Sequence, residues 1–545
     1  MRYSTPIVLS IVLLTGILGI LLTSCTKGLS TEEKLEDFSY LFETLWENHP
    51  YIELKSRVEG YNWLEHEKEF EDAVRASKND REFAKVIQRM LLMLNNGHTS
   101  VLSPQTYDLI TSLPAGMEPW REEAAKTNAK AVETWFMDAM SMVPQYPKGS
   151  TLPFRAMYCQ GEYVVYWVGE DLASEKNVPL GSTVVRIDGL RVQEFVRTLR
   201  GSTVLRYDPV RGLLFQSQLS LPYRPESYGV EFRSPDGTIV RADIGPTKLT
   251  GSIQVPVLPA NIRSMTGIST YMLADGQVAY VHIPQMIQYE ESETWARELR
   301  EFYATISDTK ALIIDLRGNG GGDSRFWMLN VVSPLIARSI TWRFTIAVKD
   351  GDYIRRFLAA NLELHTENVR GSIEVIDRSR LESMLTEEQM RNLPPEVLGP
   401  GFGDLVLTET TIEPTGDIPY RGKVFLLVDQ SVYSSAESFA VFCKATGWAT
   451  VVGECTGGDG VGYTPVIAVL PNSGLALLFP VDMGLNPDFT ANEEMHTIPD
   501  VLVERTPEDI VRLAKALAAG EGPVLPDPSY DPALRECLRL ALEVK

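Results

Sequence analysis

A serine-rich turn between two apolar stretches is the first place where this chain could do chemistry. Residues 423–430, KVFLLVDQ, have the character of a buried strand, and residues 431–442, SVYSSAESFAVF, continue as a helix-like stretch. Ser434 and Glu437 have the spacing of a capping box, in which a serine only satisfies backbone N–H groups at a helix start. A strand-to-helix turn can also hold a serine nucleophile for acyl transfer. The local sequence leaves both interpretations open.

A run of glycines follows a second apolar stretch. Residues 313–323 read IIDLRGNGGGD, with glycine at 320–322. Without side chains, backbone N–H groups can face a cavity, and fixed donors of this kind stabilise the oxyanion of acyl transfer. The alternatives are a nucleotide-binding turn and a flexible loop. Neither GxxxxGK[ST] nor GxGxxG is present, which argues against nucleotide binding.

One histidine is placed where a general base could act. His98 lies in LNNGHTSV, a small polar turn between apolar runs. His66 and His365 lie in charged stretches, and His49 precedes a proline. Most isolated histidines have no catalytic role, but histidine is the commonest general base near neutral pH. His98 is therefore the candidate base.

Two adjacent acids could orient that base. Glu493 and Glu494 lie in NEEMHTIPD, shortly before a strand-like run. Adjacent acids usually mark a solvated loop. A catalytic base is often held by a third group, however, and either carboxylate could hold His98 in this way.

The surrounding elements indicate a mixed α/β chain of several domains. Residues 30–95 have helical periodicity, beginning with a capping box at Ser30 and Glu33. Residues 160–250 contain short β-rich runs, with a hairpin signal at SPDG. From residue 278 onward, apolar runs alternate with helical stretches, as in an α/β core covered on both faces. The expected parts are a leader (1–25), a helical region (26–110), a connecting segment (111–157), a β-rich module (158–252), a core (270–505) with a charged helical insertion (340–415), and a C-terminal helical extension (506–545).

Composition limits the classes of partner. The chain has 545 residues and a net charge of −21, which argues against nucleic acid as a partner. The apolar run before Cys25 is long enough for a membrane anchor. Its end, LLTSC, resembles a bacterial lipoprotein cleavage box, which would make Cys25 the lipidated first residue and would favour the outer membrane. The later cysteines have no metal-ligand spacing, so we expect neither a metal nor another cofactor.

Four motifs together resemble the tail-specific, or C-terminal processing, serine proteases and the tricorn protease core. In this chain they read LNNGHTS, IIDLRGNGGG, SSAE and GECTGG, in the family's order. Residues 178–201, VPLGSTVVRIDGLRVQEFVRTLRG, resemble the centre of a PDZ domain, a module that commonly lies between the first two motifs. PDZ domains bind peptide C-termini at a sheet edge. The resemblance covers roughly residues 30–505 and implies a core of the crotonase-like (ClpP/crotonase) type.

Carried over by position, the resemblance assigns roles to individual residues. Ser434 is the nucleophile, with Ser435 as the alternative, and the N–H groups of Gly321 and Ser435 form the oxyanion hole. The processing-protease branch has a lysine base after GExTxG, but this chain has Asp459 there, so a Ser–Lys dyad does not fit. In the tricorn-like branch, His98 is the base.

The same branch matches Glu493 to the supporting acid. Gly97 stands where that branch has serine, so the route from Glu493 to His98 is not evident, and Thr99 or a water could bridge them. Glu494 is the alternative acid.

The resulting expectation is a serine endopeptidase of the bacterial cell envelope that cleaves unfolded or C-terminally exposed polypeptides. The alternative is a catalytically inactive, peptide-binding lipoprotein on the same fold, favoured by Asp459 and Gly97 at family positions. An α/β-hydrolase esterase is disfavoured because no GxSxG elbow surrounds Ser434.

Overall fold

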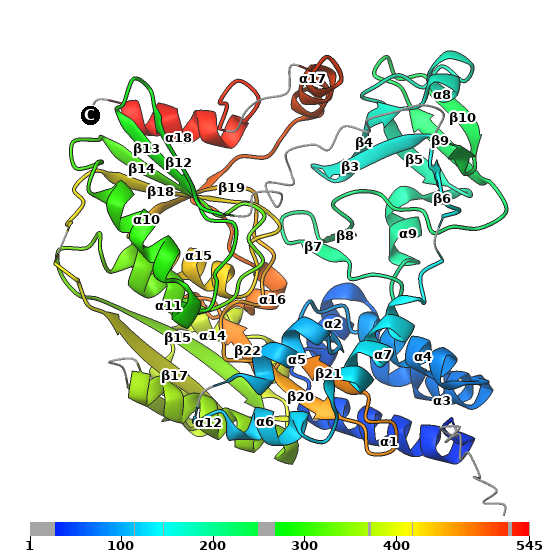
Figure 1. The fold of residues 1–545 in the computed structure, drawn as a ribbon, viewed down its shortest axis with the longest axis horizontal. Helices are drawn as coiled ribbons and strands as arrows, with labels where there is room; N and C mark the ends of the chain where they lie inside the picture. The colour runs from blue at the N-terminus through cyan, green and yellow to red at the C-terminus, as the bar shows by residue number, and fades with distance from the viewer. Residues whose placement is uncertain are drawn as a thin grey trace, which may run out of the picture.

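The computed structural model describes residues 28–113, 115–144, 146–248, 267–368, 372–416, 418–520 and 526–543. Its elements form a helical N-terminal region, a β-rich module and a sheet core with helices packed on it (Figure 1). The expected mixed fold with a helical N-terminal region is therefore confirmed. The expected leader, residues 1–25 with Cys25, lies outside the described residues. Within the described residues, no helix combines the length and the apolar content needed to cross a bilayer.

The N-terminal region consists of helices whose apolar faces pack together. They are α1 (Thr31–Asn48), α2 (Ile52–Glu59), η1 (Trp63–His66), α3 (Glu67–Ala76), α4 (Asp80–Met93), α5 (Pro104–Thr111), α6 (Glu118–Ala124) and α7 (Ala129–Met140). The capping box at Ser30 and Glu33 is confirmed, with reciprocal hydrogen bonds of 3.2 and 2.7 Å. The expected connecting segment instead contributes α6 and α7, because Trp120 and Ala139 are buried in this hydrophobic core.

Strands from the far end of the chain complete this region. β1 (Ser100–Val101) pairs antiparallel with β21 (Ala476–Phe479), which pairs with β20 (Val466–Val469). Residues 466–470 are buried in the same core as the N-terminal helices. The turn that carries His98, directly before β1, is thereby held against the C-terminal half of the chain.

The β-rich module is an antiparallel sheet that spans Phe154–Ile244, so it begins four residues earlier than expected. Its strand order is β10-β9-β5-β4-β3, with β6 paired to β5. The expected hairpin at SPDG is confirmed, because β9 and β10 flank it and pair through Arg233 and Ile239. The elements are β3 (Phe154–Cys159), β4 (Glu162–Val168), α8 (Glu170–Ser174), β5 (Thr183–Ile187), β6 (Leu190–Arg191), α9 (Val192–Arg197), β9 (Tyr228–Arg233) and β10 (Ile239–Ile244), with two small pairs beside them, β2 (Ser150–Thr151) with β11 (Thr247–Lys248) and β7 (Arg206–Asp208) with β8 (Leu213–Phe215).

The core is a six-stranded sheet in the order β12-β13-β14-β18-β19-β23. From β13 onward each strand is parallel to the next, and β12 is antiparallel to β13. The strands are β12 (Ser269–Leu273), β13 (Val278–His282), β14 (Ala311–Asp315), β18 (Lys423–Val428), β19 (Thr450–Gly453) and β23 (Val501–Leu502).

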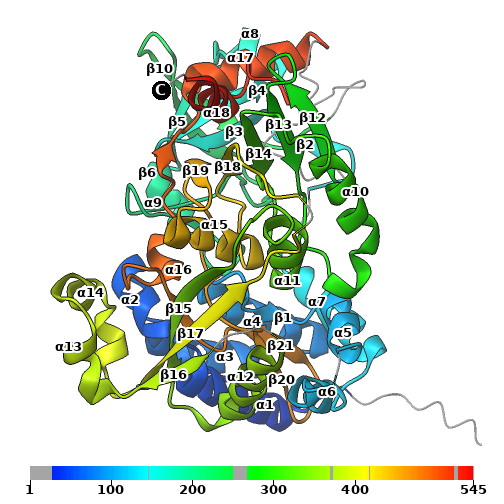
Figure 2. The same ribbon diagram turned by 90° about the vertical axis from the view of Figure 1, so that its left-hand side faces the viewer.

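Helices cover both faces of this sheet, as the continuous apolar runs predicted. α10 (Glu293–Tyr303) and α15 (Ser435–Thr446) pack on one face, and α18 (Pro532–Leu542) packs on the other (Figure 2). The carboxyl ends of neighbouring parallel strands lie at one edge, where α/β sheets commonly carry their sites. The glycine run follows β14, the serine turn follows β18, and Asp459 follows β19.

The expected helical insertion at 340–415 also contains two long strands. β15 (Ile340–Lys349) and β17 (Phe402–Ile412) form the centre of an antiparallel sheet, with β16 (Ile373–Ile376) and β22 (Met483–Leu485) at its edges. These strands were not expected, because β15 pairs with residues more than fifty positions away and its local sequence carries no hairpin signal. The remaining elements are α11 (Ser324–Phe326), η4 (Trp327–Val332), α12 (Asp352–Asn368), η5 (Arg378–Arg380), α13 (Leu381–Met384), α14 (Glu387–Asn392), η6 (Pro395–Leu398), α16 (Asn492–Met495) and α17 (Pro507–Ala518), besides the short η3 (Tyr289–Glu291).

Candidate active site

Ser434 occupies a strained turn between β18 and α15. Its backbone has φ 55° and ψ −129°, in the half of conformational space that residues with a side chain rarely adopt, at a cost of about 1–3 kcal/mol. Its side chain makes no capping hydrogen bond to α15. Glu437 is buried and accepts hydrogen bonds from Asn492 Nδ2 (2.8 Å) and Thr497 Oγ1 (2.7 Å) instead. The capping-box interpretation is therefore wrong, and the Ser434 hydroxyl is left to face the site.

His98 lies beside that hydroxyl although 336 residues separate the two in sequence. Its Nε2 is 3.2 Å from Ser434 Oγ. The backbone N–H of His98 donates to Asn96 Oδ1 (2.9 Å), and the ring packs against Tyr433 with 4.9 Å between ring centroids. The structure thus brings together the two residues that the sequence singled out as nucleophile and base.

Glycine at position 97 has a steric reason. A Cβ added to Gly97 would lie 2.7 Å from the ring carbon and the hydroxyl of Tyr433. The Gly97 N–H also donates to this hydroxyl at 3.1 Å. The departure from the family's serine therefore makes room for Tyr433.

The carboxylate that contacts His98 is that of Asp459, a residue that was not among the sequence-predicted site residues. Asp459 Oδ2 is 2.7 Å from His98 Nδ1, on the ring edge opposite Ser434. The same carboxylate accepts hydrogen bonds from Asn96 Nδ2 (2.8 Å), Tyr433 OH (3.1 Å) and Tyr51 OH (2.5 Å). Burial acts to raise the pKa of Asp459, but the His98 ring and these donors hold it well below its usual range. An ionised carboxylate in this position fixes the orientation of the imidazole.

Glu493 has its contacts elsewhere, so the expected support of His98 by this residue is corrected. Its Oε1 lies 2.7 Å from Lys55 Nζ and accepts a hydrogen bond from Asn96 Nδ2 at 3.3 Å. Asn96 thus stands between Glu493 and Asp459, because its amide nitrogen contacts both carboxylates. Burial raises the pKa of Glu493 to about 7, with Lys55 opposing the shift and Asp459 adding to it.

The two alternative residues, Glu494 and Thr99, also have their hydrogen bonds and ion pairs with residues other than His98. Glu494 forms an ion pair with Arg57 at 2.8 Å. Thr99 Oγ1 contacts His49 Nε2 at 2.9 Å and donates to Asn96 Oδ1 at 3.0 Å, so it does not bridge Glu493 and His98.

A buried chain of charges continues from the site into the N-terminal region and the β-rich module. Lys55 of α2 contacts both Glu493 (2.7 Å) and Glu59 (3.0 Å), and Glu59 contacts Arg200 of the module at 2.5 Å. All four side chains are less than 9% exposed. Although burial acts to raise it, Lys55 and Arg200 hold the pKa of Glu59 below its ordinary value.

The glycine run touches the nucleophile. Gly321 has φ +102°, and a Cβ there would lie 2.7 Å from Ser434 Cβ and 2.9 Å from Ser435 N. The N–H of Gly321 donates to Asn319 Oδ1 at 2.9 Å, so it could reach an oxyanion only by exchanging that acceptor. The N–H of Ser435 begins α15, and within the described part of the chain nothing accepts it. The Ser435 side chain is buried and accepts a hydrogen bond from Ser324 Oγ (3.2 Å), whereas Ser434 faces His98.

Comparison with known protein families supports a serine-type peptidase. Residues 277–503 match the family model of peptidase family S41.

Solved structures with similar folds include mature CPAF, with 18% identity over 91% of this chain and 99% of that chain and a TM-score of 0.51. Mature CPAF complexed with lactacystin has 17% identity, 90% and 98% coverage, and a TM-score of 0.50. The photosystem II D1 C-terminal processing protease matches with 16% identity over 91% and 99% of the two chains, and its TM-score of 0.35 is too low to establish a shared fold. At these identities the CPAF likeness establishes the fold and not the roles of individual residues.

Proposed function

We propose that this protein is an endopeptidase in which Ser434 is the nucleophile, His98 the general base and Asp459 the carboxylate that orients His98. The proposal is carried by one observation: a single imidazole contacts Ser434 Oγ on one nitrogen and Asp459 on the other, at 3.2 and 2.7 Å. This is the arrangement that activates a serine hydroxyl at neutral pH. Asp459 replaces Glu493 in the role that the sequence had suggested.

The proposed reaction is acyl transfer to water. Ser434 Oγ attacks a peptide carbonyl carbon while His98 Nε2 takes the hydroxyl proton, and the negative charge of Asp459 stabilises the resulting imidazolium. The tetrahedral oxyanion accepts the Ser435 N–H, with Gly321 as the second expected donor. His98 then protonates the leaving amine, and a water activated by His98 releases the acyl group from Ser434.

The proposed substrates are unfolded or C-terminally exposed polypeptides, and the proposed location is the bacterial cell envelope through a lipid on Cys25. The substrate class rests on the likeness of the four motifs to tail-specific proteases. The location rests on the LLTSC sequence alone. The alternative is a peptide-binding protein without activity, and the experiment must distinguish it from a peptidase.

The test uses residues 26–545 as the wild type and as the variants Ser434→Ala and Ser435→Ala. Each protein is incubated with a reduced, unfolded polypeptide at mildly alkaline pH, and fragments are identified by mass spectrometry. We expect cleavage by the wild type and by Ser435→Ala, and none by Ser434→Ala. Retention of the polypeptide without cleavage by any of them would favour the binding protein. Equal cleavage by the wild type and Ser434→Ala would exclude Ser434 as the nucleophile.

A further inference from the structure

The edge of the β-rich module where a peptide would add is occupied by the chain itself. Residues 216–219 run antiparallel to β3: the Tyr158 N–H donates to Ser217 O (3.0 Å), and the Leu219 N–H donates to Ala156 O (2.9 Å). Leu219 is buried in the module's hydrophobic core. A polypeptide end cannot pair with β3 unless this segment leaves the edge. A binding site for chain ends would therefore lie elsewhere on the protein.

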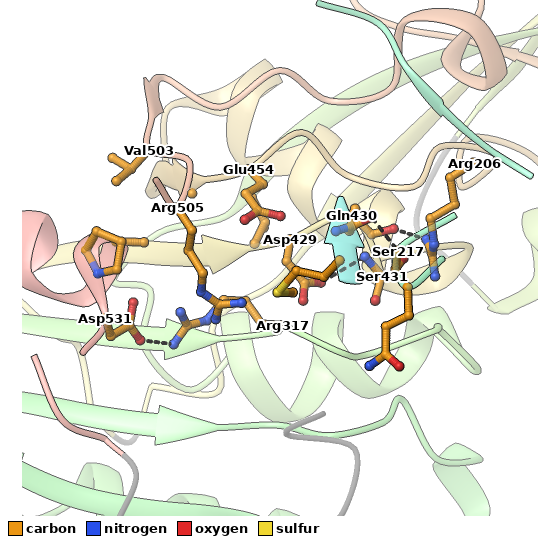
Figure 3. A pocket seen from close by; sticks show the side chains of 16 residues that line it. Arg206, Ser217, Arg317, Asp429, Gln430, Ser431, Glu454, Val503, Arg505 and Asp531 are labelled. Carbon is orange, nitrogen blue, oxygen red and sulfur yellow. Dashed lines mark hydrogen bonds and ion pairs between the residues drawn. The ribbon is translucent and has the colours of Figure 1, made fainter. Parts of the chain in front are cut away.

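A cavity of about 280 Å³ begins beside this segment (Figure 3). Ser217 and Gln218 of the module form one wall of it, and residues 429–431, which lead to Ser434, form another. Arg505 and Asp531, the N-cap residue of α18, also line it. Its volume lies just below the usual lower limit of about 300 Å³ for small-ligand pockets.

Most charged groups of this cavity already have partners. The Arg317 guanidinium contacts Asp315 and Asp531, each at 2.6 Å. Asp429 accepts the N–H groups of Gly318 (3.1 Å) and Ser431 (2.8 Å).

Arg505 differs from these groups. Its side chain extends towards the same part of the cavity as Arg317 (Figure 3), and no described residue accepts a hydrogen bond from its guanidinium or forms an ion pair with it. Its backbone carbonyl, by contrast, is engaged by Cys159 Sγ at 3.1 Å. A partly enclosed guanidinium without an acceptor is a site for a carboxylate, because its parallel N–H groups match the two carboxylate oxygens.

Glu454, another acid of the cavity, does not pair with Arg505. The Glu454 carboxyl lines the same space and has no hydrogen bond or ion pair to a described residue, whereas its backbone N–H donates to Val428 O at 3.2 Å. Burial raises the pKa of Glu454, with the positive charge of Arg505 opposing the shift. In its protonated form this carboxyl can donate a hydrogen bond to an incoming carboxylate.

We propose that this cavity binds the C-terminal carboxylate of a polypeptide, with Arg505 as its principal partner. The position of the cavity, between the module and the loop that carries the nucleophile, would place a captured chain end beside the site. That this polypeptide is a substrate rests on the proposed function, whereas the binding itself does not.

The test measures binding in the Ser434→Ala background, where failure of the peptidase proposal cannot affect the result. Short peptides of randomised sequence, without Asp or Glu, are prepared once as free acids and once as C-terminal amides. Retention by the protein is measured by mass spectrometry after ultrafiltration. We expect free acids to be retained about tenfold or more better than amides, as charge-assisted hydrogen bonds predict.

Two further variants in the same background identify the partner. Arg505→Gln should bring acids and amides to within about twofold of each other, on the same scale of interaction. Arg512→Gln, which removes an exposed arginine of α17 outside the cavity, should leave the preference unchanged. Equal retention of acids and amides by Ser434→Ala, or a preference that survives Arg505→Gln, would overturn the proposal. Circular dichroism of each variant confirms that the protein compared is folded.

Discussion

Asp459 Oδ2 lies 2.7 Å from Nδ1 of His98, across 361 residues of sequence. The Asp459 side chain is 6% exposed and the His98 side chain 18% exposed, so the carboxylate is the more shielded of the two from solvent. Asp459 stands where the processing proteases have a lysine, and it is the carboxylate that contacts His98.

The first prediction concerns the identity of this acid. Asp459→Asn should lower kcat by about 10³–10⁴-fold, because an amide can hold the imidazole in the wrong tautomer and cannot stabilise the imidazolium. Glu493→Gln should have a much smaller effect, since Glu493 does not contact His98. The measurement is kcat for both variants on one unfolded substrate. A larger loss in Glu493→Gln than in Asp459→Asn would return Glu493 to the orienting role.

The second prediction concerns strain at the nucleophile. Ser434→Gly should be more stable than Ser434→Ala by about 1 kcal/mol or more, because glycine adopts φ 55° and ψ −129° without the penalty of a Cβ. Both variants lack the hydroxyl, so the comparison isolates the backbone. Urea unfolding of the two proteins provides the measurement. Equal free energies of unfolding would mean that the turn is not strained.

The third prediction concerns the space at Gly97. Gly97→Ala should destabilise the protein by about 1–3 kcal/mol and reduce activity, because the new methyl group would lie 2.7 Å from the Tyr433 ring. Gly267→Ala, where a Cβ would meet open space, is the matched control and should leave stability nearly unchanged. Truncating Tyr433 to alanine in the Gly97→Ala background should remove the steric part of the penalty. Thermal unfolding of all four proteins distinguishes these outcomes.

The fourth prediction concerns Lys55 and pH. Lys55→Met should destabilise the fold by about 3–5 kcal/mol, because it leaves Glu493 and Glu59 without their shared cation. The pKa of Glu493 is raised from 4.5 to about 7, so the unfolded chain loses this proton first and the contribution of Glu493 to stability falls as pH rises through that range. Removing Lys55 should raise the pKa of Glu493 in the folded protein further, so that this loss of stability extends to higher pH.

The penalty of Lys55→Met should therefore be larger near pH 8 than near pH 5, as measured by urea unfolding at both values. Lys68→Met, which removes an exposed lysine paired with Asp72, is the control and should change little at either pH. A penalty for Lys55→Met that does not depend on pH would exclude Glu493 as the titrating partner.

Part of the site could be predicted from local sequence. Ser434, His98 and the glycine run each stand directly after an apolar or helical stretch, in a turn rich in small or polar residues. Such turns are recognisable because backbone geometry and residue type are coupled within a few positions. The strands of the parallel core were predictable for the same reason, since burial on both faces gives β13, β14 and β18 continuous apolar sequences.

The remainder depended on contacts between distant residues. Nothing near Asp459 in sequence shows that the loop after β19 approaches the turn before β1, and a family comparison by position marked only the lysine that is absent. Likewise β15 became recognisable as a central strand only through β17 and β22.

Local sequence was enough to pick out Ser434 and His98 as candidates for the chemistry, because reactivity depends on residue type and local turn geometry. Which carboxylate contacts His98 is known only from the folded chain, because it depends on long-range packing. Asp459 and Glu493 are both buried acids that contact Asn96, and only packing places one of them on the imidazole and the other on Lys55.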